Sequence, residues 1–124
     1  MSIIVPVIFF GFALADSMFA GLGNCLIQRR PMDAEAVREM AEKGVLTPCL
    51  NPSHQATIDA MRQRFDIDIE IPDTPPRVSL RPGDSVIVMG VRGLPRLTDR
   101  HEYTPEEIAQ ATFEFTIYSA TKEG

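Results

Sequence analysis

The residues whose types and spacing could do chemistry begin with Asn51, Pro52, Ser53 and His54. Asn51 is a good N-cap, and Pro52 suits the first helical position, where its missing N–H is no loss. The apolar residues that follow share one helical face: Ile58, Met61 and Phe65. A histidine in the first turn of that helix would lie beside free backbone N–H groups and the positive end of the helix dipole, an arrangement that binds phosphate. The same spacing also fits a polar first-turn residue without a function.

A second set of basic side chains lies in a polar stretch, residues 93–103, that we expect to form a loop. These side chains are Arg92 at the start of the loop, Arg96, Arg100 and His101. Together with His54 they suit cleavage of a ribose phosphodiester. In that reaction the neighbouring 2'-hydroxyl attacks phosphorus, an acid protonates the leaving 5'-oxygen, and arginine stabilises the phosphoryl charge. They suit passive nucleotide binding equally well. Asp99 and Glu102 leave a third interpretation open, a solvated and partly ion-paired surface.

Motifs for metals and common cofactors are missing from the sequence. It contains no phosphate-binding glycine loop, dinucleotide fingerprint or nucleophile elbow. Cys25 and Cys49 stand apart within apolar runs, without the paired spacing of a zinc site. We therefore predict no metal and no cofactor, and we interpret both cysteines as buried, reduced core residues.

The composition narrows the class of protein. At 124 residues, with 44% hydrophobic and 23% charged residues, the chain predicts one globular domain over residues 1–124. A net charge of -5 argues against a protein that coats nucleic acid through bulk positive charge. Lys43 and Lys122 are the only lysines among 12 basic residues. This arginine bias fits bidentate phosphate binding and fits a GC-rich genome equally well.

Residues 1–23 contain Asp16 as their only charged side chain and approach the length of a membrane span. However, Pro6 interrupts the apolar run, no basic residue precedes it, and glycine and polar residues break it from Gly11 onward. We therefore predict a buried strand over Ile3 to Phe10 in a cytoplasmic protein that does not enter a membrane, with a secreted protein as the alternative. Residues 11–23 would form a loop whose apolar side chains pack against the core or a partner, namely Leu14, Met18 and Phe19.

Apolar periodicity and capping residues predict the elements before the histidine. A second strand covers Asn24 to Arg30 and is closed by Pro31. A helix then extends from an Asp33 cap to a stop at Gly44. A third strand, Val45 to Leu50, leads directly into the turn that carries His54. Ligands bind at such strand-to-helix junctions in open α/β sheets, so this position favours a functional role for His54.

The second half of the chain predicts mainly antiparallel strands. Isoleucines at 67, 69 and 71 alternate with acidic residues, which indicates a half-buried strand or an extended edge. The Pro-Gly turn at Arg81 to Asp84 predicts a β-hairpin between Arg77–Leu80 and Ser85–Arg92, with the second arm central in the sheet. Thr104 begins a short helix with a capping box, and Thr112 to Ala120 is the last strand. The predicted fold class is α/β, a compact mixed sheet flanked by two main helices and one short helix, with a largely antiparallel C-terminal half.

Several of these stretches together resemble a known family. They are Val45 to Thr57 with its Ser-His helix start, Ile67 to Pro72, Arg77 to Asp84, and Val86 to Val88. This pattern is similar to the small viral and bacterial family that includes the viral ring nucleases, which are anti-CRISPR proteins acting on type III signalling. The resemblance extends over most of the chain, from Ile3 to Tyr118.

The resemblance implies a homodimer that cradles cyclic tetra-adenylate across its two-fold axis and linearises it without a metal. His54 stands at the place of the family's histidine, which acts as general acid. The family loop typically reads Arg-Leu-Pro-Glu-Gly, whereas this chain reads Gly93-Leu94-Pro95-Arg96-Leu97 and has extra residues before Thr104. Arg92 or Arg96 would replace the family arginine, and Asp99 or Glu102 the family glutamate.

We accordingly predict a protein that binds a cyclic oligonucleotide second messenger and cleaves it slowly as a homodimer. The expected catalytic residues are His54 and Arg96. The expected ligand-binding residues are Asn51, Ser53, Arg92, Arg100 and Ser17. Two alternatives remain: a protein of the same fold that sequesters the nucleotide without chemistry, and a DNA- or protein-binding regulator from a mobile element. The apolar N-terminal loop with Met18 and Phe19 suggests the surface through which two copies associate.

Overall fold

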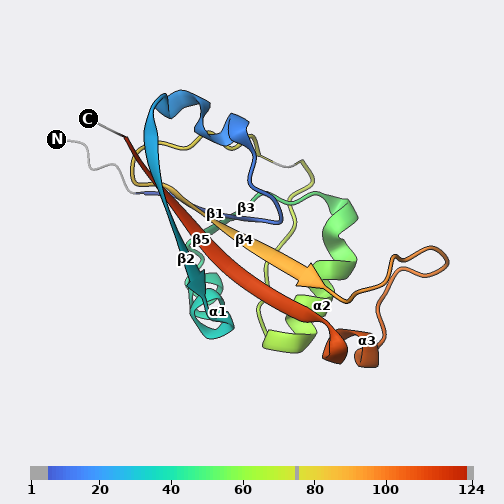
Figure 1. The fold of residues 1–124 in the computed structure, drawn as a ribbon. Coiled ribbons are helices and arrows are strands. Elements are labelled where there is room, and N and C mark those ends of the chain that lie inside the picture. The colour runs from blue at the N-terminus through green and yellow to red at the C-terminus, as the bar shows by residue number, and fades with distance from the viewer. Residues whose placement is uncertain (1–5, 75, 123–124) are drawn as a thin grey trace.

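The computed structural model describes residues 6–74 and 76–122, which form a mixed sheet of five strands with helices on its faces (Figure 1). The strands are β1 (Ile8–Gly11), β2 (Cys25–Met32), β3 (Leu46–Pro48), β4 (Ser85–Arg92) and β5 (Thr112–Lys122). Their order across the sheet is β2-β5-β4-β1-β3. β1 is parallel to both of its neighbours, whereas β5 is antiparallel to both β4 and β2. The predicted α/β class and the antiparallel C-terminal half are therefore confirmed.

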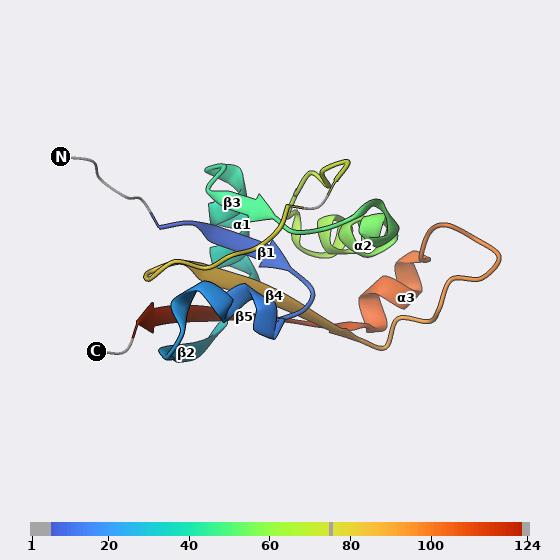
Figure 2. The same ribbon diagram turned by 90° about the horizontal axis from the view of Figure 1, so that it is seen from above.

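Two helices cover one face of the sheet, and a 3-10 helix covers part of the other (Figure 2). Helices α1 (Ala34–Glu42) and α2 (Gln55–Phe65) enclose the main core, in which Phe10, Ile58 and Ile87 are fully buried. The 3-10 helix η1 (Asp16–Leu22) lies over a smaller second core with Leu22 and Leu80. The sheet thus separates two surfaces, one covered by α1 and α2 and the other partly covered by η1.

The N-terminal segment differs from the sequence prediction in its loop. The strand expected over Ile3 to Phe10 appears as β1, while Ile3 to Val5 lie outside the described residues. The expected loop over residues 11–23 instead contains η1. Met18 and Phe19 pack against the second core as predicted, but Leu14 is exposed. The first 3-10 turn of η1 is closed by the Met18 N–H, which donates to the Ala15 carbonyl at 3.0 Å. The Leu80 N–H donates to the Met18 carbonyl at 2.8 Å and fixes this segment against the chain before β4.

Strand β2 continues through Pro31, which was predicted to close it. Pro31 lies opposite Thr116, and Met32 opposite Phe115. β2 is an edge strand with β5 as its one neighbour, so half of its N–H groups point away from the sheet and a proline costs no ladder hydrogen bond there. Cys25 and Cys49 are free thiols and are half-buried, not fully buried as expected. Burial raises the pKa of Cys49 to about 11.

Both main helices begin and end as their sequences indicate. Asp33 Oδ1 accepts a hydrogen bond of 2.8 Å from the Ala36 N–H and caps α1. Gly44, at φ 68°, provides the left-handed stop just after α1. Helix α2 buries Ile58 and Met61 against the sheet, as the spacing of its apolar residues predicts.

The predicted β-hairpin at Arg77 to Arg92 is wrong, although its turn exists. Asp84 N–H donates to the Arg81 carbonyl at 2.9 Å, and Gly83 has a φ of 92°, as a type II turn requires. Residues 77–80 form no strand because Leu80 hydrogen-bonds to η1 instead. β4 is nevertheless central, as predicted, because β1 and β5 pair on its two sides.

Gly83 should tolerate alanine poorly for a purely conformational reason. A Cβ built at Gly83 meets nothing closer than Pro6 Cγ at 3.8 Å, so the penalty arises from its positive φ. We expect Gly83→Ala to lower the free energy of unfolding by about 1 to 2 kcal/mol in urea titrations. Gly90→Ala is the matched control because Gly90 lacks a positive φ and its Cβ would enter open space. Equal losses in the two variants would contradict this explanation.

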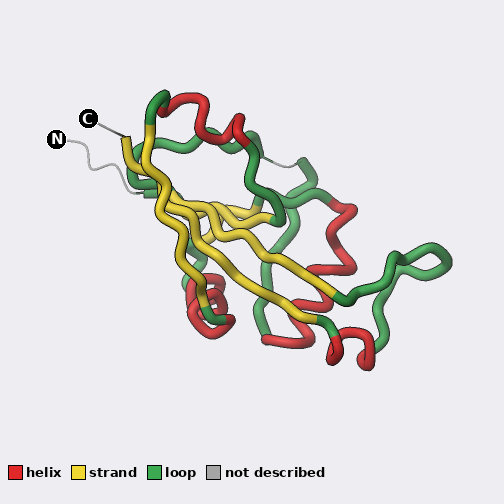
Figure 3. The backbone as a smooth tube through the Cα atoms, in the orientation of Figure 1, coloured by secondary structure: helices red, strands yellow, loops and turns green. Residues whose placement is uncertain are grey.

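The C-terminal elements follow the prediction and hold a long loop in place. Thr104 and Glu107 form the predicted capping box of α3 (Pro105–Gln110). Arg64 of α2 docks this helix, because its Nη1 donates to the carbonyls of Ile108 at 2.7 Å and Ala111 at 3.0 Å. The loop of residues 93–103 extends outward between β4 and α3 (Figure 3). Its two ends are therefore anchored, while its middle lies away from the sheet.

Candidate functional site

The candidate site lies where the parallel strands β1 and β3 end side by side. Phe10 lies opposite Pro48, and Cys49 N–H donates to the Phe10 carbonyl at 2.7 Å. Gly11, the last residue of β1, lies beside Cys49: a Cβ built there would be in van der Waals contact with the Cys49 carbonyl oxygen, at 3.5 Å. The chain then enters the turn at Asn51. This is the strand-to-helix junction that the sequence predicts, at the carboxyl edge where α/β sheets bind ligands.

Asn51 organises the turn through its side chain and its backbone. Its Oδ1 accepts hydrogen bonds from the backbone N–H of Ser53, at 2.9 Å, and from the Ser53 hydroxyl. Its carbonyl accepts the His54 N–H at 2.9 Å, which closes the 3-10 turn η2 (Pro52–His54). His54 consequently occupies the N-cap position of α2, one step before the first turn of the α-helix in which it was predicted. The cap was predicted correctly, but the tighter 3-10 hydrogen bond shifts the start of the α-helix.

The imidazole of His54 is held in one orientation. Asn51 N–H donates to its Nδ1 at 3.2 Å, so Nδ1 must be unprotonated and the neutral ring carries its proton on Nε2. The Phe12 ring packs edge-on against it with centroids 4.7 Å apart. Burial lowers the pKa of His54 below its ordinary value of 6.5, so the ring is neutral at pH 7. No described residue hydrogen-bonds to Nε2.

This geometry defines what His54 can do. The neutral ring presents an Nε2–H donor, suited to a phosphate oxygen or a hydroxyl. To act as a general acid, the ring must first gain a proton at Nδ1, which faces the Asn51 N–H and would lose that hydrogen bond. A phosphate held near Nε2 favours the charged ring and raises its pKa. In the free protein the neutral ring can therefore donate a hydrogen bond, but it can act as a general acid only if a nearby anion raises its pKa.

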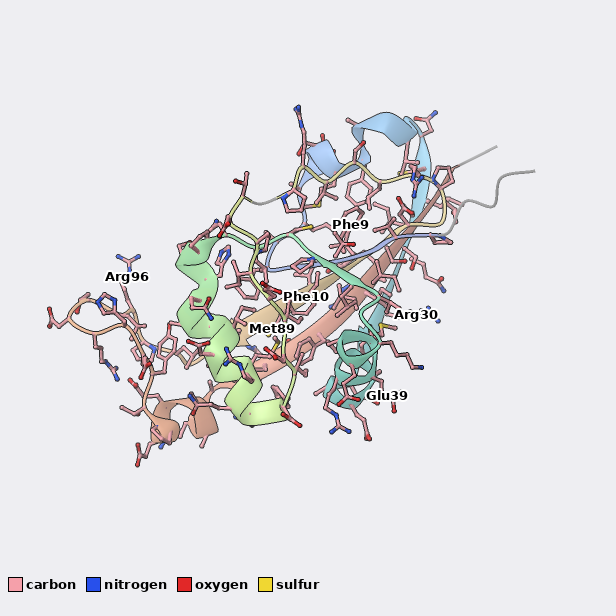
Figure 4. The ribbon with its side chains drawn as sticks, turned by 180° about the vertical axis from the view of Figure 1, so that it is seen from behind. Phe9, Phe10, Arg30, Glu39, Met89 and Arg96 are labelled. Atoms are coloured by element: carbon pink, nitrogen blue, oxygen red, sulfur yellow. The ribbon has the colours of Figure 1, made fainter. Side chains whose placement is uncertain are left out.

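The three arginines predicted with His54 are not gathered beside it within one protomer. Arg92 pairs with Glu114 at 2.6 Å on the sheet surface. Because Val91 packs on the main core and side chains alternate along a strand, Arg92 points to the face opposite α2. Arg96 projects from the outer loop (Figure 4), and it forms no salt bridge with any residue that the structure describes. Arg100 is already bound to Glu107.

The ion pair between Arg100 and Glu107 anchors the loop of residues 93–103 to α3. Arg100 Nη1 lies 2.6 Å from Glu107 Oε1, and Arg100 Nη2 lies 2.5 Å from Oε2. Glu107 Oε1 also accepts the Thr104 N–H at 2.8 Å. The Arg100 guanidinium and the Thr104 N–H lower the pKa of Glu107 to about 2. In the free protomer, Arg100 thus ties the loop to α3 through both of its terminal nitrogens.

Removing this anchor should loosen the loop. We expect Arg100→Gln to raise the pKa of Glu107 toward its ordinary value of 4.5 and to speed amide exchange across residues 93–103. Because folding lowers the pKa of Glu107, the ion pair contributes its full stabilisation of the folded state above the ordinary pKa of 4.5. This stabilisation is lost as pH falls through about 2. NMR titration of the Glu107 carboxyl measures the first effect, with Arg38→Gln, whose partner is Glu35, as control. An unchanged Glu107 pKa would rule out this anchoring role.

Ser17 is separated from His54 by the sheet. It is an exposed residue of η1, which lies on the face opposite α2 (Figure 2). Phe12, by contrast, contacts His54 and was missed, although it follows β1 on the same side as the buried Phe10. Alternation along the strand was the signal that could have indicated it. Across residues 6–74 and 76–122, no three His, Cys, Asp or Glu side chains are placed to share a metal ion.

The fold and this junction define a small mixed α/β protein whose helix α2 begins at a histidine turn. No protein-family model matches the sequence, and no match is found among curated proteins. Among solved structures, the chain is similar to B116 of Sulfolobus turreted icosahedral virus. The TM-score is 0.65 at 16% identity, covering 91% of this chain and 98% of that chain. At this identity the similarity shows the fold alone. No helix within the described residues is long and apolar enough to span a membrane.

Proposed function

We propose that the protein binds a cyclic oligoadenylate-type second messenger at the His54 turn and cleaves it without a metal, thereby countering nucleotide-signalled antiviral defence. One observation carries the proposal. The backbone of Asn51 holds the His54 ring so that Nε2 is free, at the start of a helix and at the carboxyl ends of two parallel strands. The choice of ligand rests on the sequence resemblance to the viral ring nucleases, whereas the similarity to the viral protein B116 supports the fold alone.

The proposed reaction is a transesterification within the bound nucleotide. The 2'-hydroxyl loses its proton to solvent water and attacks the adjacent phosphorus, and the bond from phosphorus to the 5'-oxygen breaks, which leaves a 2',3'-cyclic phosphate and a 5'-hydroxyl. His54, protonated once the phosphate has raised its pKa, donates the proton that the 5'-oxygen takes. An arginine on the phosphoryl oxygens would stabilise the charge that develops there, and Arg96 is the candidate because it has no ion-pair partner among the described residues.

The proposal includes a homodimer, because one protomer does not collect its arginines around His54. A second copy related by a two-fold axis would place its own loop of residues 93–103 against the first copy's His54 turn. Met18 and Phe19, the expected contact residues, pack largely on the protomer's own second core. Leu26 and Ile27 are exposed at 61% and 47%, but they lie on edge strand β2, at the opposite edge of the sheet from the end of β1 and β3 that leads to His54. A contact through these two side chains therefore does not bring the partner's loop to the His54 turn. A monomer in gel filtration at micromolar concentration would contradict this part.

The test is direct and metal-free. Purified protein is incubated with cyclic tetra-adenylate in EDTA, and the products are analysed by mass spectrometry. We expect linear products that carry a 2',3'-cyclic phosphate. Cyclic hexa-adenylate and cyclic dinucleotides in parallel reactions report ring-size preference. If cyclic tetra-adenylate is neither bound nor cleaved, the proposed function is wrong.

A sequestering protein without chemistry is the second candidate, and the resting state of His54 favours it. The neutral Nε2–H is a hydrogen-bond donor, which serves binding as it stands, whereas catalysis needs an additional proton on the ring. Nucleotide recovered intact after prolonged incubation with stoichiometric protein, followed by denaturation, would favour this candidate over the enzyme.

A further inference from the structure

A cleft unrelated to the His54 turn lies along the free edge of strand β3. Its volume is about 670 Å³. One wall is β3 with Leu46, Thr47 and Pro48, and the opposite wall is the extended chain after α2, at residues 68–70. Ala41 and Pro72 add to a mainly apolar lining. Figure 4 shows this extended chain passing between α1 and α2 on its way back toward the sheet.

The two walls are both strand-like, and neither is paired on the side of the cleft. β3 is an edge strand with β1 as its neighbour. Residues 67–71 alternate as a strand does, with Ile67 and Ile69 buried while Asp68 and Glu70 point outward. Yet within the described part of the chain, no backbone group of residues 67–71 hydrogen-bonds to another backbone group. Unpaired edges of this kind are templates for an added strand.

The rim of the cleft is acidic. Asp68 and Glu70 line the cleft, and an adjoining hollow that shares Ala41 and Asp68 adds Glu42 and Asp66. No described lysine or arginine lines either hollow. Arg62 reaches Asp68 only at 3.6 Å, and the Asp68 side chain remains 80% exposed. A ligand in this cleft would therefore meet apolar walls, backbone donors and acceptors, and a negative rim that Arg62 compensates only in part.

We propose that this cleft binds an extended basic peptide segment of a partner protein, as a strand added beside β3 with alternating apolar and cationic side chains. The apolar side chains enter the cleft toward Leu46 and Ile69, and the cationic ones face Asp68 and Glu70. The backbone of the added segment satisfies the free edge of β3. The inference does not rest on the proposed nucleotide site, because Asn51, Ser53 and His54 do not line the cleft.

The experiment uses a short fluorescein-labelled peptide in which lysine and valine alternate, and it measures binding to the full chain by anisotropy. We expect binding in the micromolar range that weakens as salt is added. The double variant Asp68→Lys/Glu70→Lys should weaken binding roughly tenfold. Glu106→Lys, an exposed change on α3, is the matched control and should bind as the wild type does. Circular dichroism of each variant establishes that it is folded.

Hydrogen exchange locates the bound peptide. Added-strand binding should slow amide exchange at Leu46, the β3 residue whose N–H points away from β1, and at residues 67–71. A peptide with proline at alternate positions should bind weakly because it lacks N–H donors. Equal binding of a glutamate–valine peptide, an equal loss with Glu106→Lys, or protection confined to other strands would each overturn the inference.

Discussion

Replacing His54 by alanine is expected to lower the single-turnover rate on cyclic tetra-adenylate by at least about a hundredfold. The variant should still bind the nucleotide within a few-fold of the wild-type affinity. The reason is that the imidazole is the one group at the α2 turn able to deliver a proton to the leaving oxygen. Under the proposed function, phosphate binding would by contrast be shared with backbone N–H groups and arginine. Rates come from quenched reactions in EDTA, and affinities from titration of labelled nucleotide.

His54→Asn separates the chemical role from the structural one. The asparagine Oδ1 can accept the Asn51 N–H in place of Nδ1, so this variant should keep the capping hydrogen bond that alanine loses, worth about 1 kcal/mol. It carries no acid, so its turnover should be as low as that of the alanine variant. Wild-type turnover in His54→Asn would exclude His54 as the general acid.

The pH profile gives an independent readout of the same residue. A general acid works only when protonated, and burial lowers the pKa of His54 in the free protein. We therefore expect kcat/KM to be highest at acidic pH and to fall as pH rises through that lowered pKa. The profile of kcat should be displaced to higher pH, because bound phosphate favours the charged ring. A flat profile for the wild type would contradict proton transfer by His54.

Replacing Asp84 by alanine is expected to cost about 3 to 5 kcal/mol of unfolding free energy, the largest stability loss that we predict for a polar residue. Asp84 is only 1% exposed. Its Oδ1 accepts the Val7 N–H at 2.9 Å, and its Oδ2 accepts the Arg81 N–H at 2.9 Å. One buried carboxylate thus joins the start of β1 to the turn before β4, and alanine would leave both N–H groups unpaired.

Urea titration followed by circular dichroism measures this loss, and the melting temperature should fall by roughly 10 °C or more. Asp99→Ala is the control, because Asp99 is exposed in the loop of residues 93–103 and surface changes of this kind stay within about 0.5 kcal/mol. A loss for Asp84→Ala no larger than that of the control would show that the carboxylate does not join the two segments.

What the sequence by itself determined is local. The caps at Asp33, Asn51 and Thr104 were predictable because each depends on a side chain and a backbone N–H a few residues away. The burial of α2 was predictable from the spacing of its apolar residues, and the turn before β4 from its Pro-Gly pair. The position of His54 between strand β3 and helix α2 was likewise predictable from the local sequence.

What only the tertiary structure decided is which distant segments meet. Residues 77–80 contact η1, and β4 takes β1 and β5 as neighbours, because these pairings join segments far apart in the chain that no local pattern encodes. The same holds for the candidate site. The sequence alone groups the arginines after His54 as possible phosphate ligands. In the structure, alternation along β4 turns Arg92 to the opposite face of the sheet, and Arg100 is paired with Glu107. Asn51 N–H sets the proton of His54 on Nε2, and that choice depends on a hydrogen bond visible only in three dimensions.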